Sequence, residues 1–165
     1  MQNQSNSKIS KSYLLIVLLL MLVLPCLSVI IEYYLGKQQL SLMNLTGKWF
    51  VFWAVGIRLF TAGLKQTINP SFTAESIFHI KDKESFVIVK ELGFANICFG
   101  TIAIISLIVP CWRVAAACSG GLYIAIAGIN HIIKKPVSPN EWIAMLSDIF
   151  IGIVMLAYII DSSIN

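Results

Sequence analysis

Four ionisable side chains interrupt apolar stretches of the sequence, and these residues are the ones most able to do chemistry. Arg58, Glu91, His131 and Asp148 each lie in or beside a run of hydrophobic residues. An ionisable group inside an apolar helix is costly, so it marks an ion pair, a proton pathway or a ligand site. The sequence therefore predicts a buried polar cluster of these four residues, with Asn96 as a neutral neighbour.

Two interpretations of this cluster remain open. In the first, Arg58 pairs with Asp148 or Glu91, asparagines hydrogen-bond across helices, and the cluster only fixes helix packing. In the second, the cluster is a polar pocket, open to the cytoplasmic side, that binds an anionic or quinone-like head group or relays a proton. His131 suits the second interpretation, because a histidine beside carboxylates exchanges protons near neutral pH.

Helical spacing indicates which way the charged residues point. Small residues stand four positions away from three of them and would let neighbouring helices approach closely. These small residues are Ala54 and Ala62 for Arg58, Ala95 for Glu91, and Ala144 and Gly152 for Asp148. We therefore expect the three charged side chains to face the interior, with all four cluster residues within about two helical turns of one another in depth.

The composition is that of a membrane protein. The chain has 165 residues, of which 58% are hydrophobic and 12% charged, whereas soluble domains have roughly a quarter charged residues. At about 20 residues per crossing, the length allows four or five membrane-spanning helices and no separate soluble domain. We read the net charge of +4 as a sign of membrane topology and expect no nucleic-acid partner.

The sequence has no signature of a self-contained enzyme. Its four cysteines are scattered and support neither a disulfide framework nor a zinc site. Catalytic serine, zinc-protease and nucleotide motifs are also missing from the sequence. We therefore expect a protein without a catalytic centre, metal or cofactor of its own.

Hydropathy predicts an all-α integral membrane protein with five spans. A polar tail, residues 1–12, is expected to be disordered in the cytoplasm. The predicted spans are about 13–34, 49–68, 86–109, 114–133 and 139–160.

Prolines and capping residues predict where these helices begin and end. Asn69-Pro70 should stop the second span, and residues 71–85 should lie at the membrane surface as a short amphipathic segment. The sequence from Pro110 to Arg113 is expected to form a tight turn. Ser138 to Glu141 matches a capping box with proline at the first helical position.

Lysine and arginine counts outside the spans predict the orientation. Seven lysines lie on the side of the N-terminus and three basic residues on the other side, so the N-terminus should be cytoplasmic and the C-terminus outside. The first group is Lys8, Lys11, Lys65, Lys81, Lys83, Lys134 and Lys135, and the second is Lys37, Lys48 and Arg113.

Three segments resemble a known family. The sequence IRLFTAGLK (57–65) resembles the opening helix of DoxX-like small membrane proteins, and ELGFANICFG (91–100) and GGLYIAIAGINHI (120–132) are similar to helices of an uncharacterised related branch. The resemblance covers about 49–160 and implies a four-helix bundle with the helix 13–34 added outside it. The residues that it marks are Arg58, Gly63, Lys65, Glu91, Asn96 and His131.

These observations lead to one expected function and two alternatives. We expect a non-enzymatic accessory subunit of the cell membrane, or a binder of a lipid-like or quinone-like ligand in the polar pocket, partnered by the bilayer and by another membrane protein or a second copy. A quinone is implied by the resemblance alone. The alternatives are a small proton-coupled transporter and a subunit of a membrane oxidoreductase, although the chain has no cysteine pair for redox work.

Overall fold

The computed structural model describes residues 11–36, 40–76 and 80–164. These residues form helices and no strand. Most of them belong to five long helical rods, three of which contain an internal π-helical segment. The rods are α1–η1–α2 (Lys11–Leu18, Leu19–Val23, Leu24–Leu35), α3–η2–α4 (Leu42–Phe50, Val51–Ile57, Arg58–Ile68), α6 (Ser85–Ile105), η3–α7–η4–α8 (Pro110–Trp112, Arg113–Ala116, Ala117–Gly121, Leu122–Lys134) and α9 (Pro139–Ile164).

Several predicted helix ends are confirmed. The rod α3–α4 ends at Ile68, and Pro70 begins a separate short helix, α5 (Pro70–Ser76). At the start of α9, the amide of Glu141 donates to Oγ of Ser138 at 3.3 Å, as the capping box requires. The Glu141 carboxylate in turn accepts from the amide of Val137.

Several predicted boundaries differ from the structure. The second long helix begins at Leu42, because Ser41 caps it by accepting from the amide of Asn44 at 3.2 Å. The segment from Pro110 to Arg113 is the first turn of a helix, since proline is favoured at that position and the chain has already turned after Ile105. The first helix begins at Lys11, so only residues 1–10 of the predicted tail lie outside the described residues.

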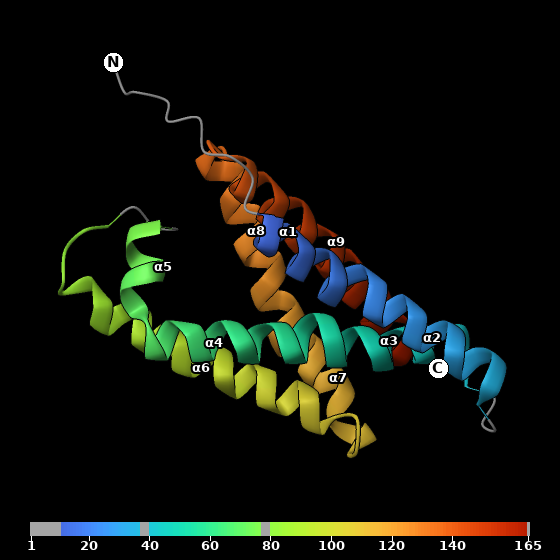
Figure 1. The fold of residues 1–165 in the computed structure, drawn as a ribbon. Coiled ribbons are helices and arrows are strands. Elements are labelled where there is room, and N and C mark those ends of the chain that lie inside the picture. The colour runs from blue at the N-terminus through green and yellow to red at the C-terminus, as the bar shows by residue number, and fades with distance from the viewer. Residues whose placement is uncertain (1–10, 37–39, 77–79, 165) are drawn as a thin grey trace.

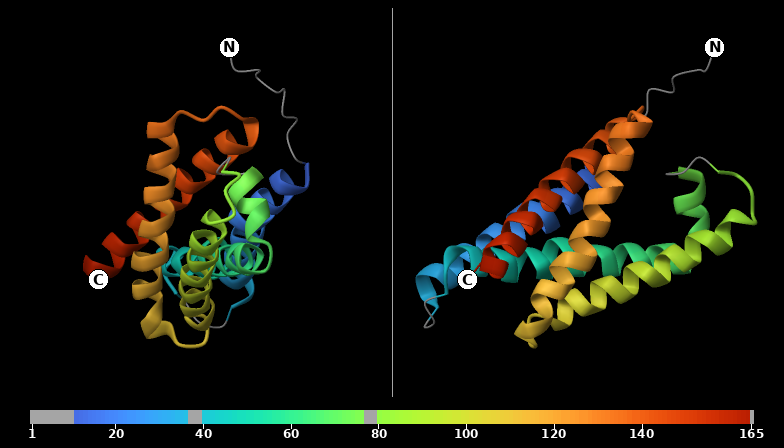
Figure 2. Two further views of the ribbon diagram at one scale, coloured as in Figure 1. Left: turned by 90° about the vertical axis from the view of Figure 1, so that its left-hand side faces the viewer. Right: turned by 180° about the vertical axis from the view of Figure 1, so that it is seen from behind.

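Two antiparallel helix pairs cross and then diverge (Figures 1 and 2). The pair of α4 with α6 is close because glycines meet backbone: a Cβ at Gly63 would lie 2.6 Å from the carbonyl oxygen of Gly93. The pair of α8 with α9 is equally close at Gly152, where a Cβ would lie 2.9 Å from that of Ala125. Such close approach by small residues is how membrane helices pack.

The first helix is part of the core. Val17 and Met21 of this helix are buried in the same cluster as residues of α3–α4 and α9, and Pro25 is fully buried as well. The resemblance implied that this helix is added outside a four-helix bundle, whereas its residues are part of the common core. It packs directly on α3 and α9.

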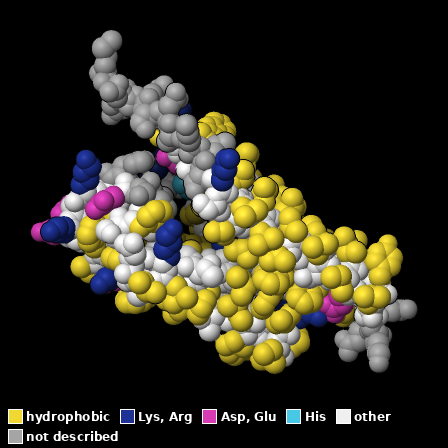
Figure 3. Space-filling model, in the orientation of Figure 1, with side chains coloured by type: hydrophobic (Ala, Val, Ile, Leu, Met, Phe, Trp, Pro, Cys, Tyr) yellow, Lys and Arg dark blue, Asp and Glu magenta, His cyan; other side chains and the backbone are white. Residues whose placement is uncertain are grey.

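The surface has an apolar zone between two charged ends. Figure 3 shows hydrophobic side chains over the middle of the molecule, with charged side chains gathered near α5 and near the turn from α2 to α3. Four helices of the described residues are long and apolar enough to cross a membrane. They are Lys11–Leu35, Ser85–Ile105, Pro110–Lys134 and Pro139–Ile164.

Candidate functional site

An ion pair between Arg58 and Asp148 joins the two helix pairs. Nη2 of Arg58, at the start of α4, donates to Oδ1 of Asp148 on α9 over 2.5 Å. Asp148 is buried, with 6% of its side chain exposed, while 20% of the Arg58 side chain is exposed. The predicted pairing of Arg58 with a carboxylate is thus confirmed, and of the two carboxylates considered the partner is Asp148.

Close helix packing explains why Asp148 is buried. Gly128 of α8 faces it, and a Cβ at Gly128 would lie 3.0 Å from the Cβ of Asp148. The predicted close helix approach on this face is confirmed at Gly152, which packs against Ala125, while the small residue that faces Asp148 itself is Gly128 of another helix. The backbone of α8 closes one side of the carboxylate.

A second polar contact lies between α4 and α6. Nδ2 of Asn96 donates to Oε1 of Gln66 over 2.7 Å, and Asn96 is 3% exposed. The sequence reasoning identified Asn96 but missed Gln66. The sequence did not indicate a buried role for Gln66, because a glutamine near the end of a helix is usually solvated.

Two tyrosines lie within electrostatic range of the ion pair. Tyr123 on α8 lies within interaction range of Asn96 and of both charged residues of the ion pair. Tyr13 on α1 lies within interaction range of Arg58 and Asp148. The polar network therefore takes at least one residue from every long rod. It comprises Tyr13, Arg58, Gln66, Asn96, Tyr123 and Asp148.

The network is incompletely satisfied. Within the described residues, Nη1 of Arg58 and Oδ1 of Asn96 are both buried and have no hydrogen-bond partner. Leaving a buried polar atom without a partner costs about 1–3 kcal/mol, and more for a charged group. One donor and one acceptor of the network thus lack a hydrogen bond, and both atoms are enclosed by the protein.

Glu91 does not belong to the network. It is exposed, and the prediction that it faces the interior is wrong. Helix α6 turns Gly93 and Asn96 toward α4, and Glu91 precedes Gly93 by two residues, which is about 200° around a helix.

His131 and Lys65 lie outside the contacts of the network in the described part of the chain. His131 is half-buried and stands one turn beyond Gly128 on α8, so its place in the predicted cluster stays a prediction. Lys65 is exposed, and its ammonium lies 3.6 Å from the centre of the Phe72 ring on α5. This cation–π contact ties α5 to α4. His79 lies outside the described residues.

A second ion pair, which the sequence reasoning missed, lies at the opposite end of the α3–α4 rod from Lys65. Nζ of Lys48 donates to both carboxylate oxygens of Glu32 at 2.6 and 2.8 Å, and Nε1 of Trp49 donates to Oε2 at 2.7 Å. These contacts, together with the bond from Trp53 to Ser28, fasten α2 to the rod α3–α4. Their role is structural, since every carboxylate oxygen is satisfied.

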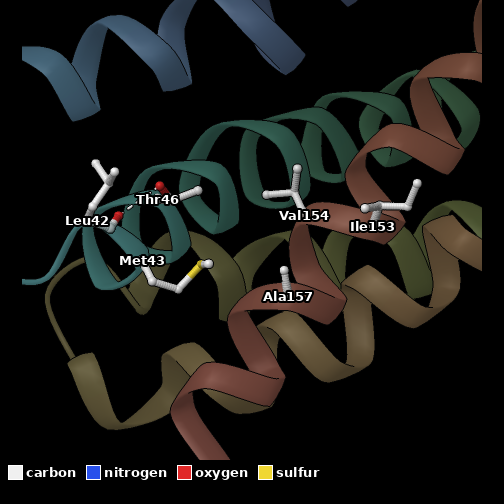
Figure 4. A pocket seen from close by; sticks show the side chains of 6 residues that line it. All are labelled: Leu42, Met43, Thr46, Ile153, Val154 and Ala157. Carbon is white, nitrogen blue, oxygen red and sulfur yellow. Dashed lines mark hydrogen bonds between the residues drawn. The ribbon is translucent and has the colours of Figure 1, made fainter.

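An apolar groove lies between α3 and the second half of α9 (Figure 4). Its volume is about 430 Å³, and its one polar side chain, Thr46, donates its hydroxyl to the carbonyl of Leu42. The groove offers apolar contact and no chemical group. Its lining residues are Leu42, Met43, Thr46, Ile153, Val154 and Ala157.

The arrangement indicates polar recognition. All four cysteines are free thiols. In the described ranges, no three His, Cys, Asp or Glu side chains are placed to hold a metal ion together. The network around Arg58 and Asp148 offers hydrogen bonding and charge.

Comparison of the chain with known proteins identifies its family. No curated protein and no solved structure has a significant match to the chain. Residues 13–163 match a family of unknown function, DUF6790, and the chain belongs to that family.

Proposed function

We propose that the chain crosses the membrane five times, with the rod α3–η2–α4 as the interior span. This rod extends from residue 42 to 68, which is about 40 Å at about 1.5 Å per residue and longer than the bilayer core. Its lower hydropathy suits a helix whose neighbours shield it from lipid. Val51, Ala54 and Val55 of this rod have no exposed surface, which supports a central position.

The proposed orientation has the N-terminus in the cytoplasm and the C-terminus outside. It rests on the seven-to-three excess of basic residues on the side of the N-terminus. Reporter fusions at Asn165 should therefore be active only outside the cytoplasm. Cytoplasmic activity of these fusions would contradict the five-span topology.

The function proposed for the network is to bind the polar head of a lipid-like or quinone-like molecule. One observation carries this proposal: a buried donor, Nη1 of Arg58, and a buried acceptor, Oδ1 of Asn96, both lack a partner within the described residues. A purely architectural cluster would gain stability by satisfying these atoms, as the Glu32–Lys48 pair does. Each unsatisfied buried polar group in a native structure needs an explanation, and a bound polar head group would supply one.

Lipid analysis of purified protein tests this function. Wild-type protein extracted in gentle detergent should retain a specific lipid-like molecule that the double variant Arg58→Met, Asp148→Leu loses. The double variant should still fold, because a buried pair can be exchanged for apolar packing at little cost. The matched control is the double variant Glu32→Leu, Lys48→Met, which should keep the ligand.

Identical bound molecules in all three proteins would contradict the ligand site and leave a packing role. The same purification, followed by mass spectrometry of proteins, tests the proposal that the chain works as an accessory subunit with a membrane partner or a second copy. A DoxX-like relationship and a place beside an oxidoreductase are part of this proposal.

Proton-coupled transport is a second candidate, favoured by one observation. The tyrosines at positions 13 and 123 lie within electrostatic range of both charges of the Arg58–Asp148 pair, and proton transfer through their hydroxyls would connect the carboxylate to other helices. Proteoliposomes containing the protein should then show a proton flux that the variant Asp148→Asn abolishes.

A further inference from the structure

Arg113 is a buried charge without a partner. It begins α7, where the chain has turned out of α6, and it is 9% exposed. Among the described residues its guanidinium takes part in no ion pair and no hydrogen bond, and its buried Nε is unsatisfied. The other arginine of the chain, Arg58, has Asp148 as its counter-ion. A buried charge left alone is costly, so an anion from outside the chain would stabilise Arg113.

The tip of the Arg113 side chain reaches the surface. Nη1 and Nη2 have no hydrogen-bond partner in the part of the chain that the structure describes, and, unlike Nε, neither is enclosed by the protein. The stem is therefore covered while the donors at its end are accessible. A guanidinium presents these donors as a flat fork that matches the oxygens of a phosphate.

The position in the helix also favours an anion. Arg113 stands in the first turns of the rod Pro110–Lys134, and these turns contain no acidic residue. The N-terminus of a helix carries partial positive charge, so a cation there is unfavourable and an anion is stabilised. Two positive features thus coincide at this end of the rod.

Arg113 lies at the edge of the hydrocarbon layer. The rod has 25 residues, which is about 37 Å at about 1.5 Å per residue and exceeds the roughly 30 Å core by a few Å at each end. As the fourth residue of the rod, Arg113 is therefore close to the level where lipid head groups begin. The preceding residue, Trp112, is exposed and is of a type enriched at that level.

The surface beside the tip is apolar. Ile108, Trp112 and Val114, the described neighbours in sequence with large side chains, are all exposed. A soluble anion gains nothing from such surface, whereas a lipid can cover it with its acyl chains while its phosphate reaches the guanidinium. The neighbours thus favour a lipid as the source of the anion.

We propose that Arg113 binds the phosphate of an anionic phospholipid at the membrane edge, where α6 turns into α7 (Figure 1). An anionic lipid is preferred over a zwitterionic one, because Arg113 has no counter-ion and the ammonium of a zwitterionic head offsets the phosphate charge. This site shares no residue with the network around Arg58, so it stands independently of the function proposed above.

Solid-state NMR of the wild-type protein tests the contact. The chain contains two arginines, so isotope labelling of arginine nitrogens gives side-chain signals from Arg58 and Arg113 alone. Labelled aspartate carboxylate carbons identify Arg58, because its Nη2 donates to Asp148. In membranes of phosphatidylglycerol and a phosphate-free galactolipid, lipid phosphorus should dephase the signals of Arg113 and leave those of Arg58 unchanged.

Two further membranes distinguish the source of the anion. In galactolipid membranes with inorganic phosphate in the buffer, no dephasing of Arg113 is expected. Equal dephasing there would replace the lipid by a soluble anion and overturn the proposal. Absence of dephasing in phosphatidylglycerol membranes would also overturn it, and would indicate that water satisfies the guanidinium.

Lipid titration followed by native mass spectrometry tests the preference for an anionic lipid. Delipidated wild-type protein should bind its first phosphatidylglycerol about tenfold more tightly than phosphatidylcholine, the effect of about one charge-assisted hydrogen bond. Arg113→Gln should lose most of this preference. The matched control Lys134→Gln removes the same charge at an exposed position at the other end of the rod and should keep it.

The remaining outcomes of the titration also decide the proposal. An equal loss of preference in both variants would indicate general attraction by net charge and contradict a site at Arg113. Equal affinity of the wild-type protein for the two lipids would contradict the selection of an anionic lipid. If Arg113→Gln does not fold, the NMR experiment still decides the contact, because it uses the wild-type chain.

Discussion

Two ion pairs among the described residues, Glu32–Lys48 and Arg58–Asp148, differ in how many of their polar atoms form hydrogen bonds. At the turn from α2 to α3, both oxygens of Glu32 accept hydrogen bonds from Lys48, and Trp49 adds another. In the interior, Arg58 and Asp148 share one hydrogen bond, and Nη1 of Arg58 has no partner among the described residues. The peripheral pair is complete, whereas the interior pair leaves a group available.

The two pairs also differ in what they connect. Glu32 and Lys48 are 16 residues apart and join consecutive helices. Arg58 and Asp148 are 90 residues apart and join α4 of one helix pair to α9 of the other. A local, partly exposed pair needs little support, whereas the interior pair depends on the packing of α4, α8 and α9 around it. This difference sets the size of the effects expected below.

The largest effect should come from removing the charge of Asp148. In Asp148→Asn the shape is kept, but Arg58 remains as a largely buried charge without a counter-ion. We expect a loss of about 3 kcal/mol in the free energy of unfolding, the lower end for a broken buried pair because Arg58 is partly exposed. Chemical denaturation in detergent, followed by circular dichroism, measures this loss.

The double variant Arg58→Met, Asp148→Leu is the control for this prediction. It removes both charges, so it should regain most of the lost stability. A single variant that is as stable as wild type would mean that water or lipid already solvates Arg58. The contrast with the peripheral pair would then disappear.

The sequence predicted both residues of the interior pair but wrongly placed Glu91 beside them. Arg58 and Asp148 were identifiable because a charge in an apolar run has few explanations. Glu91 was misassigned because Ala95, the small residue on its face, does not lie where α4 packs on α6. Contacts between specific helices depend on which glycines meet, and periodicity alone does not give that.

The tyrosines were missed for a related reason. From sequence alone, an aromatic residue in an apolar helix, such as Tyr123, is interpreted as a core residue or as one at the membrane interface. The segment η4, directly before α8, is π-helical and shifts the faces that follow it relative to a regular helix. The five rods and the α9 cap were predictable because they depend on local composition, whereas the network depends on tertiary contact.

Gly63→Ala should have the next largest effect. The added Cβ would lie 2.6 Å from the carbonyl oxygen of Gly93 and 2.8 Å from the backbone nitrogen of Ile97, so α4 and α6 must separate. We expect a loss of about 1–3 kcal/mol, even though alanine is the better helix former. Separation should also weaken the hydrogen bond from Asn96 to Gln66.

The exposed residue Thr61, on the same helix, provides the control for Gly63→Ala. Thr61→Ala should change the unfolding free energy by less than about 0.5 kcal/mol, as surface substitutions do. Unchanged stability in Gly63→Ala would indicate that the helices are not in close contact at this point.

A smaller effect is expected from Glu32→Gln, the peripheral counterpart of Asp148→Asn. Both side chains of this pair are about one-fifth exposed, at 19% and 20%, so solvent screens the charge that is lost. The glutamine oxygen can still accept from Trp49. We expect a loss of no more than about 1 kcal/mol, and a loss equal to that of Asp148→Asn would refute the distinction between the pairs.

Salt should separate the two pairs with the smallest effect. Raising the ionic strength from about 0.01 M to about 1 M shortens the screening length from roughly 30 Å to roughly 3 Å, and this acts mainly on charges that ions can approach. Double-mutant cycles at both salt concentrations measure the coupling energy within each pair. The Glu32–Lys48 coupling should fall by a few tenths of a kcal/mol, because both side chains reach the surface. The Arg58–Asp148 coupling should stay constant, because 94% of the carboxylate side chain is shielded by packing, as its 6% exposure indicates. An equal fall in both couplings would mean that ions enter the network, and a hydrated path would then replace the enclosed head-group site.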